Sequence, residues 1–503
     1  MKDSEYSIML KRTYSHILGY TGNMLIGFSI VLMIPVIFCF LYPDEWKNSW
    51  YFVESSVITF IIGFALRYPN KTDKNNVLTV KEGAIVVLLV WTLNILFSAL
   101  PFMFSHTLNF TQAVFEATSG WTTTGLTVVD VTKISKLLLI WRSLMQYFGG
   151  AGFAIIVTSS IIGPAGFGFY HAEGRTDNLL PNVKKSAKMI MLIYGTYAIL
   201  GMFFYVLAGM KFFDAFNHSL TALATGGFST RVNSIGEFNS KTIEFITIIL
   251  MVLGTTGFGV HFTLWKGDFK TFIKNPEPWL LFSLILFFTP FVTNNLSSIF
   301  PNFSEAFRHS LFQDISALTG TGFSTVSFNN WPGFSMMALI ILMIIGGGMD
   351  STSGGLKLYR VFVLLKLIVI EVTSFFLPKN VVKSYVVWKG QMKRIIDSST
   401  IKEILLIFAL YFITYITGVM ILLGHGYSVM DSLFEFASAL STVGLSVGIT
   451  TPNAPISVLW TETVGMFLGR LEFMVVLYAL AKMFRDIDIL IMERKETKRI
   501  KSD

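Results

Sequence analysis

The stretch F-Q-D-I-S-A-L-T-G-T-G-F-S, residues 312–324, decides the fold because similar stretches occur at three other places in the chain. These read F-E-A-T-S-G-W-T-T-T-G-L-T at 115–127, N-H-S-L-T-A-L-A-T-G-G-F-S at 217–229 and F-E-F-A-S-A-L-S-T-V-G-L-S at 434–446. The four copies align without a gap on a glycine that is followed by Phe or Leu and then by Ser or Thr. A motif that recurs four times along one chain indicates one fold assembled from four equivalent parts.

Long apolar runs lie on both sides of each copy. Of the 503 residues, 53% are hydrophobic and only 14% are charged, whereas soluble proteins carry about 25% charged residues. A helix of roughly 20 apolar residues crosses the hydrocarbon core of a bilayer. We predict ten such spans, at 24–42, 51–65, 83–104, 137–162, 189–208, 243–264, 279–292, 334–372, 404–423 and 458–483. Each repeat is then a span, a re-entrant loop and a second span.

The predicted fold class is an all-α integral membrane protein with four pseudo-symmetric helix/pore-loop/helix repeats around a central pore. Two extra N-terminal transmembrane helices precede the repeats. The predicted boundaries are 1–80 for the N-terminal pair, 81–185 for repeat 1, 186–275 for repeat 2, 276–400 for repeat 3 with an intramembrane gating loop, and 401–503 for repeat 4 and a cytoplasmic tail.

Basic residues predict the orientation in the membrane. Most of the 39 Lys and Arg residues lie before the first span, after the even-numbered spans and in the C-terminal tail. Positive residues concentrate in loops that remain cytoplasmic, so both termini are expected in the cytoplasm. This bias also explains the net charge of +8, so the charge requires no nucleic-acid partner. The single cysteine, Cys39, excludes an internal disulfide and is expected to be a buried thiol.

The four loops predict a cation pathway. Irregular backbone at membrane depth is tolerated only where it is buried in protein or faces water. The residues before each glycine form short helices whose negative C-terminal ends attract a cation, and backbone carbonyls then replace its hydration shell. An interfacial turn is the alternative for one copy, but four gapless copies argue against it. The predicted filter residues are Thr123, Thr124, Gly125, Thr225, Gly226, Gly227, Gly320, Thr321, Gly322, Thr442, Val443 and Gly444.

Polar residues occupy the position nine residues before each filter glycine. They are Glu116, His218, Gln313 and Glu435. Because only two of the four are acidic, we expect them to make structural hydrogen bonds rather than to supply a negative potential at the entrance.

A glycine-rich interruption breaks the second helix of the third repeat, since glycine costs about 1 kcal/mol per helical position. A kink or close helix packing is the simpler interpretation, but a break below a filter favours a movable loop across the pore. The predicted gate comprises Gly346, Gly347, Gly348, Asp350, Ser351, Thr352, Ser353, Gly354, Gly355 and Arg470. Asp350 is expected either to pair with a cation or to line the inner vestibule.

Arg470 lies inside the last predicted span. A charged group there is unfavourable unless it faces the pore or a partner. Pairing with Glu472 is one alternative, although residues two apart diverge on a helix.

These motifs resemble the Trk/Ktr/HKT superfamily of potassium transporters, specifically its TrkH-type bacterial members, over essentially the whole chain. The matching stretches are T-T-T-G, A-T-G-G-F-S-T, T-G-T-G-F-S-T and S-T-V-G-L, with R-S-L-M-Q-Y-F-G-G-A-G-F from Arg142, G-G-G-M-D-S-T-S-G-G-L-K from Gly346 and G-R-L-E from Gly469. Asp350 departs from the family, in which a small residue is common. Gly125 matches potassium-selective members, because a serine in the first segment marks sodium-preferring relatives.

The resemblance implies potassium uptake across the bacterial inner membrane by a homodimer with a pore in each protomer. It implies regulation by a separate cytoplasmic nucleotide-binding protein of the TrkA type, and an electrostatic barrier at Arg470 beside the gating loop. The chain itself is expected to need no cofactor, with potassium as its substrate and membrane lipids as its surroundings.

Two alternatives remain open from the sequence. A sodium-permeable or cation-coupled symporter of the same superfamily would share these motifs, and the residues do not distinguish channel-like conduction from coupling to protons or sodium. An integral-membrane enzyme acting on a lipid-linked substrate would need a charged catalytic cluster at one interface. The loops after Phe323 and Leu445 are nearly free of charge, so we expect no enzyme.

Overall fold

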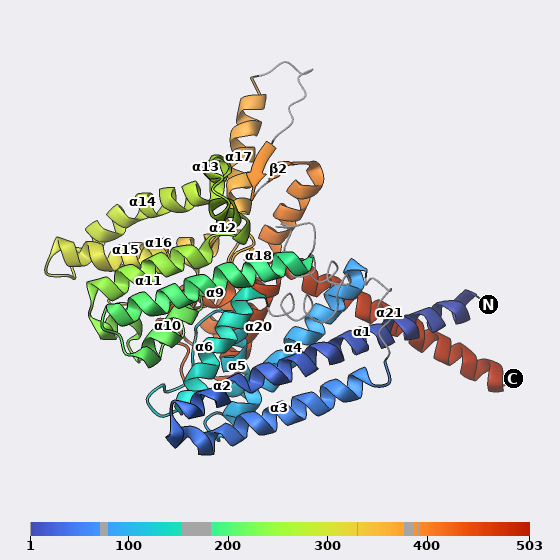
Figure 1. Ribbon diagram of the computed structural model, residues 1–503. Coiled ribbons are helices and arrows are strands. Elements are labelled where there is room, and N and C mark those ends of the chain that lie inside the picture. Colours follow the sequence, from blue (N-terminus) through green and yellow to red (C-terminus); the bar gives the residue numbers. More distant parts are fainter. Residues whose placement is uncertain are drawn as a thin grey trace.

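The computed structural model describes residues 2–70, 79–152, 183–328, 330–376, 386–390 and 392–502, and these are almost entirely helical (Figure 1). The chain begins with α1 (Lys2–Leu32) and α3 (Trp46–Arg67), joined by α2 (Ile34–Ile37), η1 (Phe38–Phe40) and η2 (Pro43–Glu45). A Cβ added to Gly22 on α1 would lie 2.6 Å from the carbonyl oxygen of Gly63 on α3. Small residues therefore let these two helices pack closely.

Each of the four repeats contains a long helix, a short pore helix and a second helix. Repeat 1 comprises α4 (Val80–Phe104), α5 (Phe110–Trp121) and α6 (Lys136–Ala151), and repeat 2 comprises α9 (Val183–Leu207), α10 (Phe212–Leu223) and α11 (Lys241–Thr255). Repeat 3 comprises α14 (Pro276–Leu296), α15 (Phe303–Thr319) and α16 (Gly333–Ile345), and repeat 4 comprises α18 (Ser398–Gly424), α19 (Val429–Leu440) and α20 (Ile456–Leu471). The predicted all-α membrane fold is thus confirmed.

The remaining elements lie in the loop after the second pore helix, connect the repeats or follow them. They are η4 (Ser234–Phe238), α12 (Phe258–Trp265), α13 (Phe269–Lys274), α17 (Leu358–Ser374), the strands β1 (Val386–Lys389) and β2 (Met392–Ile395), and α21 (Phe473–Ser502). The strands form an antiparallel hairpin in which Val386 pairs with Ile395. The N-terminus of α1 and the C-terminus of α21 project on the same side of the molecule (Figure 1). The two helices contact each other further in, where the Tyr14 hydroxyl donates to Asp486 at 3.0 Å.

Six helices in the described ranges are long and apolar enough to cross a membrane, or eight if each of two bent helix pairs is one span. The other two predicted spans correspond to α6, which ends at Ala151, and to α16 with α17. Residues 153–162 of the fourth predicted span lie outside the described residues. The first span was predicted to start too late, because the apolar helix runs from Ile8 to Phe40. Its early part buries Ile17 completely in the core.

Two further spans that we predicted as continuous are broken. The helices α11 and α12 meet at 104°, and α20 and α21 meet at 101°. Together with the ends of α6 and α16, this places a helix end at a similar point in the second helix of every repeat. Only the break in the third repeat was predicted, because the glycine cluster is densest there.

Candidate functional site

The four pore helices end in the same way. The amide of the residue before each filter glycine donates to the carbonyl five residues earlier, at 2.9 to 3.0 Å. The pairs are Thr124 with Ser119, Gly226 with Thr221, Thr321 with Ser316, and Val443 with Ser438. This bond requires a left-handed residue just past the helix, as in the Schellman motif. Thr123, Thr225, Gly320 and Thr442 supply it, with φ between 48° and 69°.

The filter glycines lie in a closed ring of backbone contacts. All four have positive φ, from 73° to 96°. A Cβ on Gly125 would collide with the carbonyl of Gly226, one on Gly227 with that of Thr321, one on Gly322 with that of Val443, and one on Gly444 with that of Thr124. Each repeat thus contacts the next, and the fourth contacts the first. Only glycine fits at positions where neighbouring backbone approaches this closely.

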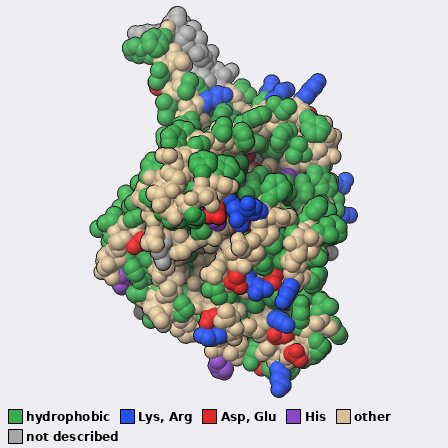
Figure 2. Space-filling model, turned by 90° about the vertical axis from the view of Figure 1, so that its left-hand side faces the viewer, with side chains coloured by type: hydrophobic (Ala, Val, Ile, Leu, Met, Phe, Trp, Pro, Cys, Tyr) green, Lys and Arg blue, Asp and Glu red, His purple; other side chains and the backbone are tan. Residues whose placement is uncertain are grey.

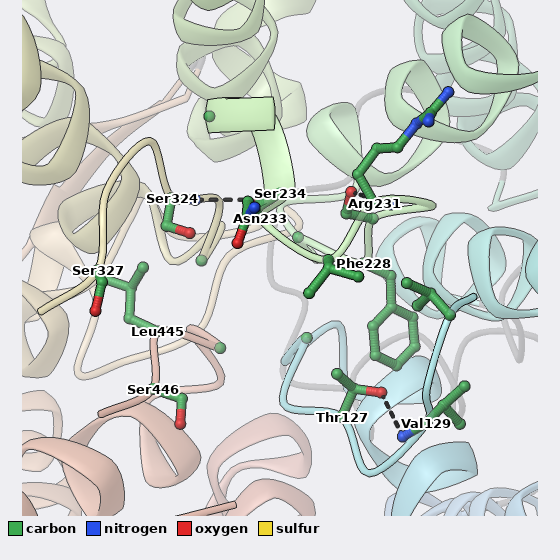
Figure 3. Close-up of a pocket in the computed structure, with 18 of the residues that line it drawn as sticks. Thr127, Val129, Phe228, Arg231, Asn233, Ser234, Ser324, Ser327, Leu445 and Ser446 are labelled. Carbon is green, nitrogen blue, oxygen red and sulfur yellow. Dashed lines mark hydrogen bonds between the residues drawn. The ribbon is translucent and has the colours of Figure 1, made fainter. Parts of the chain in front are cut away.

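The ring opens into a cavity of about 970 Å³ that all four filter glycines line. Figure 3 shows residues of all four repeats around this cavity. Thr127 and Val129 come from repeat 1, Phe228 and Ser234 from repeat 2, Ser324 and Ser327 from repeat 3, and Leu445 and Ser446 from repeat 4. Segments far apart in the sequence therefore bring the four filter glycines together at this cavity, with the residues whose carbonyls they contact.

The lining of the cavity carries charges of both signs. Asp130, Arg142 and Arg231 are among its lining residues. The Lys133 ammonium group and the Thr132 hydroxyl lower the pKa of Asp130 to about 2, so its carboxylate stays ionised at physiological pH. Figure 2 shows acidic and basic side chains scattered over one face of the molecule, among hydrophobic side chains and the backbone.

The polar residues nine positions before the filter glycines hold the chain that follows each glycine. Glu116 accepts from the Thr127 hydroxyl and the Val128 amide, at 3.0 and 3.1 Å. The other three make corresponding bonds, His218 to Ser229, Gln313 to Thr325 and Glu435 to Ser446. The expected structural hydrogen bonds are thus confirmed, and they tie each pore helix to the segment leaving the filter.

Two residues of the first repeat, for which no role was predicted, support the neighbouring filter segment. The buried Arg142 donates to Glu116 at 2.7 Å and to the Ser229 carbonyl at 3.0 Å. The Gln146 amide group donates to the Gly226 carbonyl at 2.6 Å, and its oxygen accepts from the Phe228 amide at 3.1 Å. Gln146 thus fixes the carbonyl that lies against Gly125 in the ring. The sequence feature that could have identified both residues is the stretch that starts at Arg142, because its polar residues lie inside an apolar span.

The glycine-rich segment of repeat 3 lies directly against the filter. The Thr352 hydroxyl lies 3.0 Å from that of Thr225, and the Thr123 hydroxyl donates to the Thr352 carbonyl at 3.4 Å. On the other two repeats, a Cβ on Gly320 would lie 2.8 Å from the Ser353 hydroxyl, and one on Gly354 would collide with the Thr442 hydroxyl. The segment therefore contacts the left-handed residue of all four repeats.

Hydrogen bonds to the C-terminal end of α11 anchor this loop. The Thr352 hydroxyl and amide both donate to the Gly254 carbonyl, at 2.8 and 3.3 Å. The Gly348 amide donates to the Thr255 carbonyl at 3.0 Å. Within the loop, the Lys357 ammonium group donates to the Ser353 carbonyl. The loop from repeat 3 thus satisfies carbonyls that the end of α11 in repeat 2 leaves free.

Arg470 lies beside the loop at the bend between α20 and α21. Its guanidinium group donates to the Thr352 carbonyl, and to the carbonyls of Gly149 and Gly150 at 2.7 and 3.4 Å. Glu472 pairs instead with Arg360, at 2.7 Å. Arg470 thereby joins the loop of repeat 3 to the second helices of repeats 1 and 4.

Asp350 forms an ion pair with Lys389 of strand β1, at 3.3 Å, and both side chains are only about 5% exposed. Its φ of 55° places it at a tight turn of the loop. Of the two expectations for Asp350, pairing with a cation is the one that the structure supports. The β-hairpin that supplies Lys389 was not predicted, because its strands contain only four residues each.

We expect Lys389→Met to destabilise the protein by about 3–5 kcal/mol, because it leaves the buried Asp350 carboxylate without its counter-ion. Combining it with Asp350→Asn should recover a large part of this loss, since neither side chain is then charged. Thermal unfolding in detergent measures both effects. A double variant no more stable than Lys389→Met would show that the ion pair is not what anchors the loop.

Comparisons with known proteins agree with this architecture. The model of the TrkH family, described as cation transport protein, matches residues 49–275 and 269–486. An uncharacterized cation transporter of Methanocaldococcus jannaschii is 30% identical over 482 residues, covering 95% of this chain and 97% of that protein. The Trk system potassium uptake protein TrkH of Escherichia coli K12 is 31% identical over 471 residues, covering 90% and 95%.

A solved structure has the same fold. The crystal structure of the potassium transporter TrkH from Vibrio parahaemolyticus superposes with a TM-score of 0.80 at 27% sequence identity, covering 92% of this chain and 98% of that one. The family is one of multi-pass membrane transporters and not of enzymes. Sequence, fold and filter ring lead to one conclusion: this chain belongs to the TrkH family of cation transport proteins.

Proposed function

We propose that this chain takes up potassium through the ring formed by its four filter segments. The observation that carries the proposal is the closed set of contacts in which the carbonyl before one filter glycine lies against the glycine of the next repeat. Carbonyl oxygens held at fixed positions replace the hydration shell of a potassium ion. The names of the Escherichia coli and Vibrio parahaemolyticus relatives support potassium as the substrate.

The gate in this proposal is the loop 346–355 together with Arg470. The loop crosses the pathway next to the filter, so an ion that leaves the filter meets Thr352 first. Arg470 adds a positive charge beside this point, which repels a cation electrostatically. Opening requires the loop to leave the axis, and the glycines at both of its ends allow the backbone change.

We further propose a homodimer in the bacterial inner membrane with both termini in the cytoplasm. The basic N-terminal and C-terminal segments support this orientation. A cytoplasmic nucleotide-binding subunit of the TrkA type would act on the loop from that side. The relative in Escherichia coli is named as part of a Trk system, which supports a multi-component assembly.

Ion flux in proteoliposomes tests the substrate and the mode of transport together. We expect potassium, or rubidium as its tracer, to enter at least about tenfold faster than sodium at equal driving force, which corresponds to a difference of about 1.4 kcal/mol. Equal fluxes would favour the sodium-permeable alternative. Imposing a proton gradient separates channel-like conduction, in which flux follows the potassium gradient alone, from coupled transport.

A further inference from the structure

Repeat 4 contains two buried carboxyl groups where repeat 1 contains an ion pair. Arg142 lies seven residues after Ser135, which caps α6, and Glu462 lies seven residues after Pro455 at the start of α20. In repeat 1, Arg142 pairs with Glu116. In repeat 4, Glu435 takes the place of Glu116, so two acids face each other there.

A single hydroxyl group connects these acids. The Thr450 oxygen lies 2.6 Å from Oε1 of Glu435 and 3.0 Å from Oε2 of Glu462. A hydroxyl group has one hydrogen, so it donates to one carboxyl group and can only accept from the other. Both contacts are therefore satisfied only when one of the two acids carries a proton.

The other hydrogen bonds identify which acid is protonated. Glu435 also accepts from the Ser446 hydroxyl and from the amides of Val447 and Thr450, at 2.7 to 2.9 Å. Such a set of donors stabilises a carboxylate. Glu462 is fully buried, and its Oε1 has no hydrogen-bond partner among the described residues. A neutral carboxylic acid is the form that tolerates this environment.

No positively charged side chain takes the place of this proton between the two acids in the described part of the chain. Four of the described helices pack against α20, and their titratable groups are Glu116 of α5, Asp431 and Glu435 of α19, Lys402, Glu403, Tyr411 and Tyr415 of α18, and Tyr478, Lys482, Arg485, Asp486, Asp488 and the charged residues that follow them on α21. Helix α20 itself carries Arg470 and is capped by Glu472, and His425 caps α18. Glu435 is the ionisable group that the Thr450 hydroxyl connects to Glu462. Within the described part of the chain, no Lys, Arg or His nitrogen pairs with either carboxyl group.

We propose that the folded protein holds a structural proton on Glu462, which donates through the Thr450 hydroxyl to the Glu435 carboxylate. The proton takes the place that Arg142 has in repeat 1. Glu435 holds Ser446 and Val447, the residues that leave the fourth filter segment, so Glu462 is a positioning residue for that segment. Loss of the proton would put two charges beside each other and separate α20 from α19. The effect on conduction rests on the proposed function, but the position of the proton does not.

The same isosteric change at the two acids tests this assignment. Glu462→Gln keeps a neutral donor toward Thr450, so potassium flux should stay within about twofold of the unchanged protein. Glu435→Gln places an amide NH₂ group against backbone amides, and flux or folded yield should fall at least about tenfold. Thr461→Ala is the matched control, because Thr461 is next to Glu462 but is partly exposed and donates to the Ser457 carbonyl of its own helix. It should leave flux and folded yield unchanged.

Infrared spectroscopy of the unchanged protein provides a readout that does not depend on transport. We expect the carbonyl stretch of a protonated carboxylic acid to persist at mildly alkaline pH, to disappear in Glu462→Gln and to remain in Glu403→Gln. If Glu435→Gln removed the band instead, the proton would lie on Glu435, and this result would overturn the proposal. Equal loss of flux in both variants, restored by a high potassium concentration, would show a cation between two carboxylates and overturn the proposal. A protein that keeps the band but does not prefer potassium would refute only the proposed function.

Discussion

Gly125→Ser is expected to lower the ratio of potassium to sodium flux by at least about tenfold. A side chain at φ of 95° is strained, and its Cβ would collide with the Gly226 carbonyl. Relief of the backbone strain and of this collision displaces a carbonyl of the ring. A tenfold change in selectivity requires only about 1.4 kcal/mol, less than the combined cost of backbone strain and a shifted carbonyl. Competition between sodium and rubidium for uptake in proteoliposomes measures the ratio.

Gly209→Ser is the matched control for this variant. Gly209 also has a strongly positive φ, 91°, but a Cβ there has nothing within 4 Å. It lies in the turn before α10, away from the filter. The control should therefore lose some stability and keep its ion preference. Unchanged sodium competition in Gly125→Ser, together with normal folding, would contradict a filter made of these carbonyls.

The features repeated in the sequence were the ones that could be predicted. Four aligned glycines predicted four pore segments, and the structure adds that they close into one ring. The position nine residues before each glycine predicted a structural hydrogen bond, because residues as different as Glu116 and Gln313 share only the ability to make one. These predictions concern interactions within a repeat, over about a dozen residues, where spacing alone brings the groups together.

The helix breaks in repeats 2 and 4 could not be predicted in the same way. The end of α11 at Thr255 is stabilised by the loop of repeat 3, whose amides bond to the free carbonyls. The local sequence G-T-T-G, residues 254–257, is compatible with a continuous helix or with a break. The partner that decides between them lies almost a hundred residues further along the chain.

Arg142, Gln146 and Lys389 illustrate the same limit for side chains. Arg142 and Gln146 act on the segment of the next repeat, and Lys389 pairs with Asp350 from a hairpin between two repeats. Polar residues inside an apolar span indicate that a partner exists. They do not indicate which partner, since that depends on how the repeats pack.

Arg470→Ala is expected to raise ion leak at least about tenfold in the absence of any regulatory subunit. The variant removes the guanidinium group that binds the Thr352 carbonyl and those of Gly149 and Gly150. Hydrogen bonds from a charged donor contribute roughly 1.5–3 kcal/mol each. The loss of one is already enough to shift a closed-to-open equilibrium of the loop tenfold. Rubidium efflux from loaded proteoliposomes measures the leak.

Two further variants separate the charge of Arg470 from its hydrogen bonds. Arg470→Lys keeps the positive charge but replaces the planar fork of donors with a single ammonium group, so an electrostatic barrier alone would leave the leak low. Thr352→Val keeps the charge and the shape of the loop but removes the hydroxyl that binds Gly254 and faces Thr225. If hydrogen bonds hold the loop closed, both variants should show increased ion leak. In Thr352→Val the leak would arise because the loop loses its hydrogen bond to Gly254 of α11. A leak in Arg470→Ala alone would instead make the charge the barrier, and a reduced leak in that variant would exclude Arg470 from holding the pore closed.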